Sequence, residues 1–482
     1  MHDDLDLAIV GGGTAGLTAA VLAAEVGARV ALVESGRTGG DCLWTGCVPS
    51  KSLIATADLA HRMRHADDVG LTPTDPAIDL GHVLDRVRKV QARIAPKDSA
   101  ERLEGLGVEV ITDHAKLEPG GIVALGSGDR RRARSRIVAT GSTPAIPPVE
   151  GLADAAPLTS DTVWDLDTLP QRLVVLGAGP VGCELSQAFA RLGAEVTLVE
   201  AAQQVLPAED PDVGELIAGC LTADGVRVRT SAQAERVDSG TVALRTGGGQ
   251  REDVAYDRLL VATGRNPRTV GLGLETLGVG TGDKGAVAVD SRLRTTSPGV
   301  FAAGDVTGVL PFTHVAAYQA GIATLNALFG LRRRARYDSV PWVTFTAPEV
   351  ARVGCSEAEA RRRWGSKAVV TRFDYAEVDR AIAAATPHGF AKLVGDHRGR
   401  LVGAAVAAPA AGEVIAELAT LVARSAKVGD VFRTVHPYPT FSVGVAAAGG
   451  EHLRARFLSP RTRRLTRPLL AVRRRSTPRR PR

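Results

Sequence analysis

Cysteine, methionine and aromatic residues are scarce in this chain of 482 residues, which has five cysteines, two methionines and 4% aromatic residues. So few cysteines argue against a secreted disulfide scaffold. The sequence also has no apolar run of about eighteen residues and no cationic, apolar leader after Met1. These absences favour a cytoplasmic protein. Glycine is abundant, with 53 residues, as is typical of an α/β fold with many tight turns.

The formal net charge of +6 is unevenly distributed. Residues 451–482 carry twelve arginines and one glutamate, a local charge of +11, which leaves −5 for residues 1–450. The tail has the periodicity of a short amphipathic helix around Leu465, Leu469 and Leu470. A solvated, disordered tail is the default expectation, and weak association with an anionic membrane is the main functional alternative. Specific nucleic-acid binding is not expected, because interleaved aromatic residues are missing.

Two segments show the order strand, glycine-rich turn, helix, strand and acid that is typical of dinucleotide binding. In the first, the apolar strand Leu5–Val10 leads into a glycine-rich turn, and a second strand ends in Glu34. Gly13 lets a pyrophosphate approach the helix N-terminus, and Glu34 is placed to accept a ribose hydroxyl. The binding residues predicted in this turn are Gly11, Gly13, Thr14, Ala15 and Gly16.

The same order recurs about 165 residues later, where a second turn is followed by a strand that ends in Glu200. A carboxylate at this position repels a 2′-phosphate, and residues 201–204 offer no arginine to bind one. We therefore expect NADH rather than NADPH at this second site. The binding residues predicted in the turn are Gly177, Gly179, Pro180, Val181 and Gly182.

A cysteine pair lies in residues 39–51, GGDCLWTGCVPSK. Cys42 and Cys47 lack the second ligand pair that a zinc site needs. On an ideal helix, residues five apart rise by about 7.5 Å, beyond the Cα separation of about 4.4–6.8 Å that a disulfide allows. A bond between them therefore requires a distorted first turn, and such strain makes a disulfide easier to reduce. The alternative is a pair of small buried apolar residues.

Residues 39–51 and the two glycine-rich turns resemble the pyridine nucleotide-disulfide oxidoreductases, which include dihydrolipoamide dehydrogenase, glutathione reductase and mercuric reductase. The resemblance extends over residues 5–455. It implies an α/β fold with two Rossmann-like dinucleotide-binding domains, for FAD and for NAD, and an α+β C-terminal dimerisation domain. The implied segments are 1–145 (FAD-binding), 146–263 (NAD-binding), 264–336 (return to the FAD-binding domain), 337–455 (dimerisation) and 456–482 (basic tail).

The resemblance also implies a role for individual residues. Cys42 corresponds to the interchange thiol that faces the substrate, and Cys47 to the charge-transfer thiol beside the flavin. Lys51, one helical turn after Cys47, would pair with Glu184 near the flavin N5, unless both are ordinary surface charges. For His314, a structural role at a helix start is the alternative. The further cofactor contacts implied are Gly40, Asp41, Ala115, Thr140, Gly141, Gly264, Gly304, Asp305 (on the ribityl chain), Thr313 and His314.

The C-terminal motif departs from that of relatives that act on dithiols. They use His-Pro-Thr, with a glutamate four residues after the proline as the orienting partner of the histidine. Aligning Pro439 and Thr440 places Tyr438 at the histidine and Val443 at the glutamate. Tyrosine, with a reference pKa of about 10, is a poor proton shuttle at neutral pH. His436 lies two residues earlier and would share a face with Tyr438, without an orienting partner.

A tyrosine at this position and the sequence Cys42-Leu43-Trp44 resemble mercuric reductases instead. A soft metal ion needs thiolates rather than a proton donor, although no cysteine follows Cys355, whereas mercuric reductases usually end in a vicinal pair. We predict a homodimeric flavoenzyme without a resident metal, which passes electrons from NADH through FAD and the Cys42–Cys47 disulfide to a soft-metal or small thiol/disulfide acceptor. The alternatives are a dihydrolipoamide dehydrogenase that tolerates Tyr438 and an NADH- or redox-sensing flavoprotein.

Overall fold

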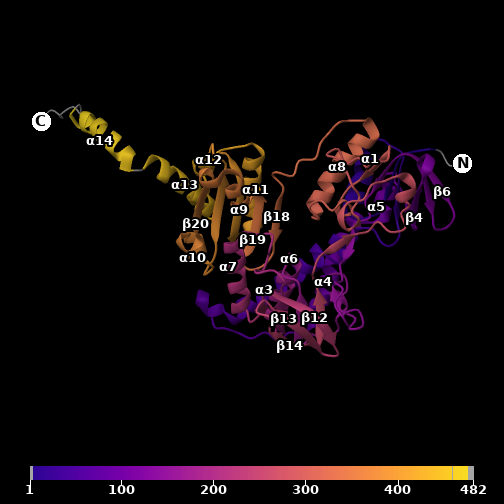
Figure 1. The fold of residues 1–482 in the computed structure, drawn as a ribbon, viewed down its shortest axis with the longest axis horizontal. Helices are drawn as coiled ribbons and strands as arrows, with labels where there is room; N and C mark the ends of the chain where they lie inside the picture. The colour runs from indigo at the N-terminus through magenta and orange to yellow at the C-terminus, as the bar shows by residue number, and fades with distance from the viewer. Residues whose placement is uncertain (1–3, 459, 476–482) are drawn as a thin grey trace. The chain divides into compact units, whose positions relative to one another are not determined.

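The computed structural model of the protein describes residues 4–458 and 460–475 (Figure 1). The chain divides into two compact units, with the boundary between Arg336 and Tyr337. Within the described residues, no helix is both long and apolar enough to span a membrane.

The first sheet of unit 1 has the strand order β3-β2-β1-β6-β5-β4, and β17 also pairs with β6. The central strands are parallel, so their carboxyl ends lie at one edge, where Glu34 ends β2 and Gly11 and Ala139 follow β1 and β6. The helices α1 (Thr14–Glu25) and α8 (Thr313–Phe329) pack against each other beside this sheet (Figure 1). The strands are β1 (Leu5–Val10), β2 (Val30–Glu34), β3 (Glu109–Thr112), β4 (Ala115–Glu118), β5 (Ile122–Leu125), β6 (Arg130–Val138) and β17 (Val300–Ala302).

The second sheet of unit 1 is parallel throughout, in the order β11-β10-β9-β15-β8. The three central strands, β10, β9 and β15, are largely apolar and buried, as expected for a sheet covered on both faces. Its strands are β8 (Leu158–Thr159), β9 (Arg172–Leu176), β10 (Glu195–Val199), β11 (Arg227–Arg229) and β15 (Arg258–Val261). An antiparallel sheet of β12 (Ala232–Asp238), β13 (Thr241–Thr246) and β14 (Arg251–Ala255) shares an apolar core with it.

Two short antiparallel strands, β7 (Ser142–Pro144) and β16 (Arg265–Pro267), pair where the chain passes between these sheets. Helix α3 packs against both α4 and α6, so it links the two halves of unit 1. The remaining helices of the unit are α2 (Gly40–Trp44), α3 (Cys47–Arg64), α4 (Leu80–Ile94), α5 (Ala100–Gly105), α6 (Pro180–Arg191) and α7 (Pro211–Ala223). The two parallel sheets confirm the predicted α/β class, while the predicted segment boundaries within residues 1–336 stay a prediction.

Unit 2 is built on an antiparallel sheet in the order β18-β19-β22-β21-β20. The strands are β18 (Pro341–Thr344), β19 (Glu349–Gly354), β20 (Val369–Asp374), β21 (Phe390–Gly395) and β22 (Leu401–Ala408). The helices are α9 (Glu357–Trp364), α10 (Asp379–Ala383), α11 (Ala411–Ala423), α12 (Val428–Arg433), α13 (Val443–Phe457) and α14 (Pro460–Arg475). An apolar core lies between the sheet and α11, α12 and α13.

Helix α14 corrects the default expectation of a disordered basic tail, because the described part of the tail is helical from Pro460 to Arg475. The amphipathic periodicity around Leu465, Leu469 and Leu470 therefore predicted the local structure correctly, whereas the default expectation of disorder did not. Residues 476–482 of the predicted tail lie outside the described residues.

Candidate active site

The cysteine pair lies at a break between two helices. Cys42 is in α2, whereas Cys47 begins α3, and the backbone leaves the helical path at Thr45 and Gly46. A Cβ added at Gly46 would lie 2.9 Å from the carbonyl oxygen of Asp41, so this position favours glycine. The distorted turn that the spacing predicts is therefore confirmed, and the two sulfur-bearing side chains are within hydrogen-bond contact.

Both cysteines are free thiols in this structure, and their environments divide the protons between them. The hydrogen bond from Cys42 lowers the pKa of Cys47 to about 6, against an opposing effect of desolvation, and Thr313 and Lys51 lower it further. The hydroxyl of Thr313 lies 3.5 Å from Cys47 Sγ. The same hydrogen bond, together with burial, raises the pKa of Cys42 well above its usual range. At neutral pH, Cys47 is therefore the thiolate and Cys42 keeps its proton.

Lys51 and Glu184 form the pair that the resemblance implies. Lys51 Nζ donates to Glu184 Oε2 at 2.7 Å, and the glutamate side chain is only 5% exposed. The interaction joins α3, directly after the cysteine pair, to α6, directly after the second glycine-rich turn. The reading of two separate surface charges is therefore wrong for this pair, although its role beside a flavin stays a prediction.

Three side chains hold the segment that carries Cys42 and Cys47 in place, and two of them, Gln91 and Trp164, were not among the residues predicted from the sequence. Gln91 of α4 donates to the carbonyl oxygens of Leu43 and Trp44, at 3.1 and 2.8 Å, and so caps the end of α2. The Trp44 indole donates to Thr38 O at 2.7 Å, and the Trp164 indole donates to Thr45 O at 2.9 Å. A tryptophan in a turn-rich segment was the only local signal, because Gln91 and Trp164 are distant in sequence from the residues that they contact.

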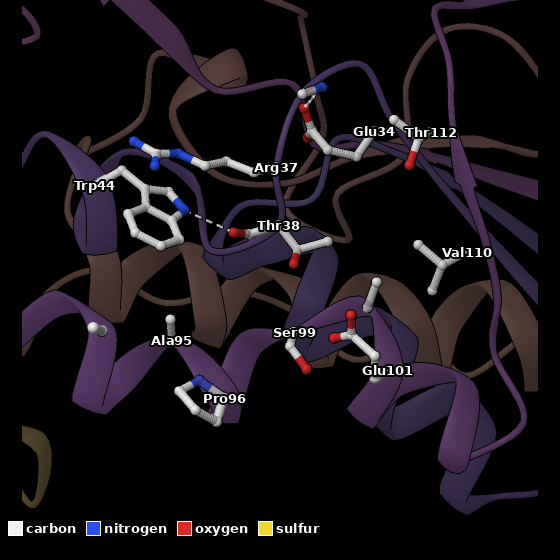
Figure 2. A pocket seen from close by; sticks show the side chains of 13 residues that line it. Glu34, Arg37, Thr38, Trp44, Ala95, Pro96, Ser99, Glu101, Val110 and Thr112 are labelled. Atoms are coloured by element: carbon white, nitrogen blue, oxygen red, sulfur yellow. Dashed lines mark hydrogen bonds between the residues drawn. The ribbon is translucent and has the colours of Figure 1, made fainter.

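A cavity of about 470 Å³ lies beside the first glycine-rich turn and suits the adenosine half of a dinucleotide (Figure 2). Glu34 lines it, and its carboxylate accepts from the backbone N–H groups of Gly12 and Gly36, at 2.6 and 2.8 Å. Its remaining lone pairs can accept ribose hydroxyls. Trp44 also lines the cavity, beneath the Arg37 guanidinium at 3.7 Å from the ring centroid.

The N-terminus of α1 fits the pyrophosphate of FAD. The first turn of the helix has no acidic residue and no side-chain cap, so its N–H groups and dipole favour an anion. A Cβ added at Gly13 would meet only the Cα of Gly40, at 3.7 Å, while one added at Gly40 would lie 2.5 Å from the Cα of Gly13. The two glycines therefore let α2 approach the turn closely. The predicted residues Gly11, Thr14, Ala15 and Gly16 lie in the same turn.

The second glycine-rich turn repeats this geometry. The Glu200 carboxylate accepts from the backbone N–H groups of Ala178 and Ala202, at 2.7 and 2.8 Å, as Glu34 does in the first turn. The first turn of α6 has no acidic residue, and a Cβ added at Gly179 would meet nothing within 4 Å. These residues fit a second dinucleotide, with Gly177, Pro180, Val181 and Gly182 in the turn.

A charged network connects Asp305, which is predicted to contact the ribityl chain, to Asp41, the residue before Cys42. Ser142 Oγ donates to Asp305 at 2.8 Å and accepts from Arg265 Nε at 2.7 Å. Arg265 also pairs with Asp41, and with Asp161 at 3.3 Å. Burial raises the pKa of Asp41, while Arg265 opposes this shift. Arg265 was not among the residues predicted from the sequence, although it directly follows Gly264 and begins β16, where the chain passes between the two sheets.

The other residues predicted to contact cofactors lie at element ends in unit 1. Thr140 and Gly141 follow β6, and the Thr140 hydroxyl donates to Arg268 O at 2.6 Å. His314 stacks on Phe312 at 5.5 Å between ring centroids, which fits its structural reading. Ala115 begins β4, Gly264 precedes β16, Gly304 precedes Asp305, and Thr313 begins α8.

Tyr438 and His436, both in unit 2, have different partners. The Tyr438 hydroxyl donates to Asp379 Oδ2 at 2.5 Å, and this hydrogen bond raises the pKa of the tyrosine. His436 Nε2 lies 2.9 Å from Glu417 Oε2, and its Nδ1 lies 2.9 Å from Thr434 O. The expectation that His436 lacks an orienting partner is therefore wrong, because α11 supplies Glu417. Val443 lines the same cavity of about 70 Å³ as Tyr438.

Two parallel sheets with dinucleotide-type turns, and a dithiol at the break between α2 and α3, define an oxidoreductase of the disulfide-reducing class. Residues 5–320 match the family described as pyridine nucleotide-disulphide oxidoreductase, and residues 340–448 match its dimerisation domain. The chain therefore belongs to the pyridine nucleotide-disulphide oxidoreductases. This class of enzyme is FAD-dependent and uses pyridine nucleotides, and the dimerisation domain supports a homodimer.

Relatives of known activity include both mercuric and lipoamide-linked enzymes. The chain is 36% identical to a mercuric reductase of Streptomyces lividans, over 93% of this chain and 96% of the relative. It is also 36% identical to a dihydrolipoyl dehydrogenase of Thermus scotoductus, over 92% and 96%. Among solved structures, the Cu(II) complex of the HOCl-induced flavoprotein disulfide reductase RclA from Escherichia coli superimposes with a TM-score of 0.83, at 28% identity, over 93% of this chain and 99% of that one.

Proposed function

We propose that the protein is a cytoplasmic, NADH-dependent reductase that converts its Cys42–Cys47 disulfide to a dithiol and then reduces a soft metal ion or a small disulfide. In the first half-reaction, NADH and the disulfide give NAD⁺, the Cys42 thiol and the Cys47 thiolate. The first glycine-rich turn and Glu34 would hold FAD, which would supply the hydride acceptor and the path of the electron pair to sulfur. The remaining tasks belong to side chains of this chain.

The unequal protonation of the two thiols carries this proposal. A thiolate at Cys47 is the form expected of the sulfur beside a flavin, and the Lys51 ammonium near it stabilises the negative charge. Glu184, nearly buried, fixes the direction of that ammonium. Cys42 is then the thiol that meets the acceptor, as the resemblance implies.

The nicotinamide cofactor that we propose is NADH rather than NADPH. Glu200 is held by two backbone N–H groups at the point where a ribose would lie, so a 2′-phosphate would face a fixed carboxylate. Gln204 does not offer a cation there, and its side chain donates to Glu209 O.

A soft metal ion is the acceptor class that this site suits best. The raised pKa of Cys42 means that disulfide exchange through this sulfur needs a base to remove its proton. Tyr438, at the position of the missing histidine, donates its own proton to Asp379. A metal ion with high affinity for thiolate displaces the proton by itself. Mercuric reductases are among the relatives, at the same identity as a dihydrolipoyl dehydrogenase, so the choice rests on the site.

An anaerobic titration of the holoenzyme with NADH tests the proposal, followed by an acceptor screen with mercuric ion, cupric ion, lipoamide and small disulfides. The wild type should consume about twice as many equivalents of NADH as Cys42→Ser, because only the wild type has a disulfide to reduce. Equal consumption by both proteins would show that the pair takes no electrons. Metal reduction that survives in Cys42→Ser would remove Cys42 from the acceptor site.

Dihydrolipoamide dehydrogenase activity is the second candidate, and the His436–Glu417 pair favours it. The contact of His436 Nε2 with a carboxylate is one half of a general acid/base arrangement. Its Nδ1 now faces Thr434 O and would have to leave that carbonyl to reach a substrate. If lipoamide is the acceptor, His436→Gln should reduce its turnover by about 10²-fold or more, with metal reduction unchanged. Unchanged lipoamide turnover in this variant would leave the His436–Glu417 pair as a structural contact.

A further inference from the structure

Helix α14 presents an apolar strip and a cationic strip to solvent. Leu465, Leu469 and Val472 follow the spacing i, i+4, i+7, so they share one side of the helix. Their side chains are 72%, 69% and 67% exposed. Arg467 and, two turns further on, Arg474 lie on the opposite side, Arg464 lies at the edge of that side, and all three are exposed as well. The family match ends at residue 448, so nothing in the family accounts for this helix.

We propose that α14 binds the surface of an anionic lipid bilayer, lying in the plane of the interface with its apolar strip in the acyl region. This mode suits a helix with a strongly cationic side and a narrow apolar side. At 16 residues, with arginines along its length, α14 is not a spanning segment. The inference concerns where the enzyme acts and does not depend on the acceptor proposed above.

Charge decides between a membrane and a second α14 helix as the occupant of the strip. No acidic residue follows Glu451 in the sequence, so two α14 helices packed together would bring like charges into contact. An anionic bilayer attracts the same arginines and also receives the leucines. A nucleic acid would bind the arginines but would leave the apolar strip in water.

The internal proline weakens α14, so that a membrane would also stabilise its helical form. Pro468 removes one backbone hydrogen bond from a helix of 16 residues, and an isolated helix of this length is marginal in water. An interface that takes up the leucines stabilises the helical form. The helix content of the tail should therefore rise on binding to anionic vesicles.

Sedimentation of the full-length holoenzyme with lipid vesicles tests the proposal. Vesicles of phosphatidylcholine with phosphatidylglycerol should bind the protein, whereas phosphatidylcholine alone should not. Leu465→Ser with Leu469→Ser should weaken binding by about tenfold or more, because the apolar strip is lost. Arg464→Gln, Arg467→Gln and Arg474→Gln together should weaken it by about 100-fold, from roughly fivefold per arginine at an anionic surface.

Matched substitutions in unit 1 provide the controls. Leu71→Ser with Val270→Ser removes apolar side chains that are 67% and 94% exposed, and Arg332→Gln, Arg333→Gln and Arg334→Gln together remove three exposed charges. Both control proteins should bind anionic vesicles like the wild type, and all variants should keep NADH-driven flavin reduction.

Three results would overturn the proposal. The first is an equal loss of vesicle binding in the unit 1 controls, which would indicate a general charge effect. The second is vesicle binding that the leucine substitutions leave intact, which would indicate a purely electrostatic tail. The third is binding to duplex DNA or single-stranded RNA that requires α14, without binding to vesicles, which would identify a nucleic acid as the partner.

Discussion

The pKa of Cys47 should be set mainly by the proton on Cys42, and the long-wavelength thiolate-to-flavin band of the holoenzyme reports this pKa. The thiolate is present above its pKa of about 6, so the band should fade as the pH falls through about 6. The largest cause of the lowered pKa is the hydrogen bond from Cys42. Removing that donor must therefore raise the pKa of Cys47 and move the midpoint of the band to higher pH.

The variants Cys42→Ala and Cys42→Ser separate the effect of the hydrogen bond from the effect of the disulfide. Neither variant can form the disulfide, so both should show the band without a reductant. A hydrogen bond to a charged group contributes about 1.5–3 kcal/mol, and one pKa unit corresponds to about 1.36 kcal/mol. Cys42→Ala should therefore move the midpoint to about pH 7–8. Cys42→Ser keeps a donor and should stay near that of the reduced wild type.

Two further variants complete the titration. Thr313→Val removes a weaker donor, whose oxygen lies 3.5 Å from Cys47 Sγ, and should raise the midpoint by about one pKa unit or less. Cys47→Ser should abolish the band, because only the sulfur of this residue is assigned to the flavin. The absorbance is measured against pH under anaerobic conditions. Equal midpoints for Cys42→Ala and Cys42→Ser would refute the hydrogen-bond argument, and a band in Cys47→Ser would refute the assignment of the two thiols.

Three other predictions concern the cofactors and the acceptor. Arg265→Gln should weaken FAD binding about tenfold in a fluorescence titration, because it removes the cation that pairs with Asp41. The effect is modest since Asp41 is 41% exposed and Arg268 also lowers the pKa of its carboxyl. Adding Asp41→Asn should restore most of the affinity. Glu200→Gln keeps the acceptor oxygen but removes the charge, so the KM ratio of NADPH to NADH should fall by about tenfold. Tyr438→His with Val443→Glu should raise lipoamide turnover by about 10²-fold or more, because both positions line one cavity, whereas mercuric ion reduction should not improve.

Each of these expectations can fail in a distinct way. An Arg265→Gln protein that binds FAD as tightly as the wild type would mean that Asp41 needs no counter-charge. An unchanged KM ratio in Glu200→Gln would remove charge repulsion as the basis of cofactor choice. A wild type that already turns over dihydrolipoamide as fast as the double variant would show that Tyr438 is no handicap, and the second candidate function would replace the first.

The sequence alone determined the features that depend on local pattern. The two glycine-rich turns, the acids that end their second strands and the α/β class follow from short-range periodicity and turn chemistry. The break between α2 and α3 follows from helix geometry at two cysteines five residues apart. The sequence also shows that the His-Pro-Thr motif and its glutamate are missing around Tyr438. These properties are local because backbone hydrogen bonds and side-chain periodicity act over a few residues.

Only the tertiary structure decided which side chains are partners. Lys51 and Glu184 are 133 residues apart and Arg265 and Asp41 are 224 apart, yet both pairs are in contact. The orienting partner of His436 is Glu417 of α11, 19 residues away, and no sequence motif predicts this contact. The charge on Cys47 depends in the same way on Thr313, 266 residues later. Such contacts are set by how the sheets and helices pack, and packing depends on the whole chain at once, so no short stretch of sequence contains it.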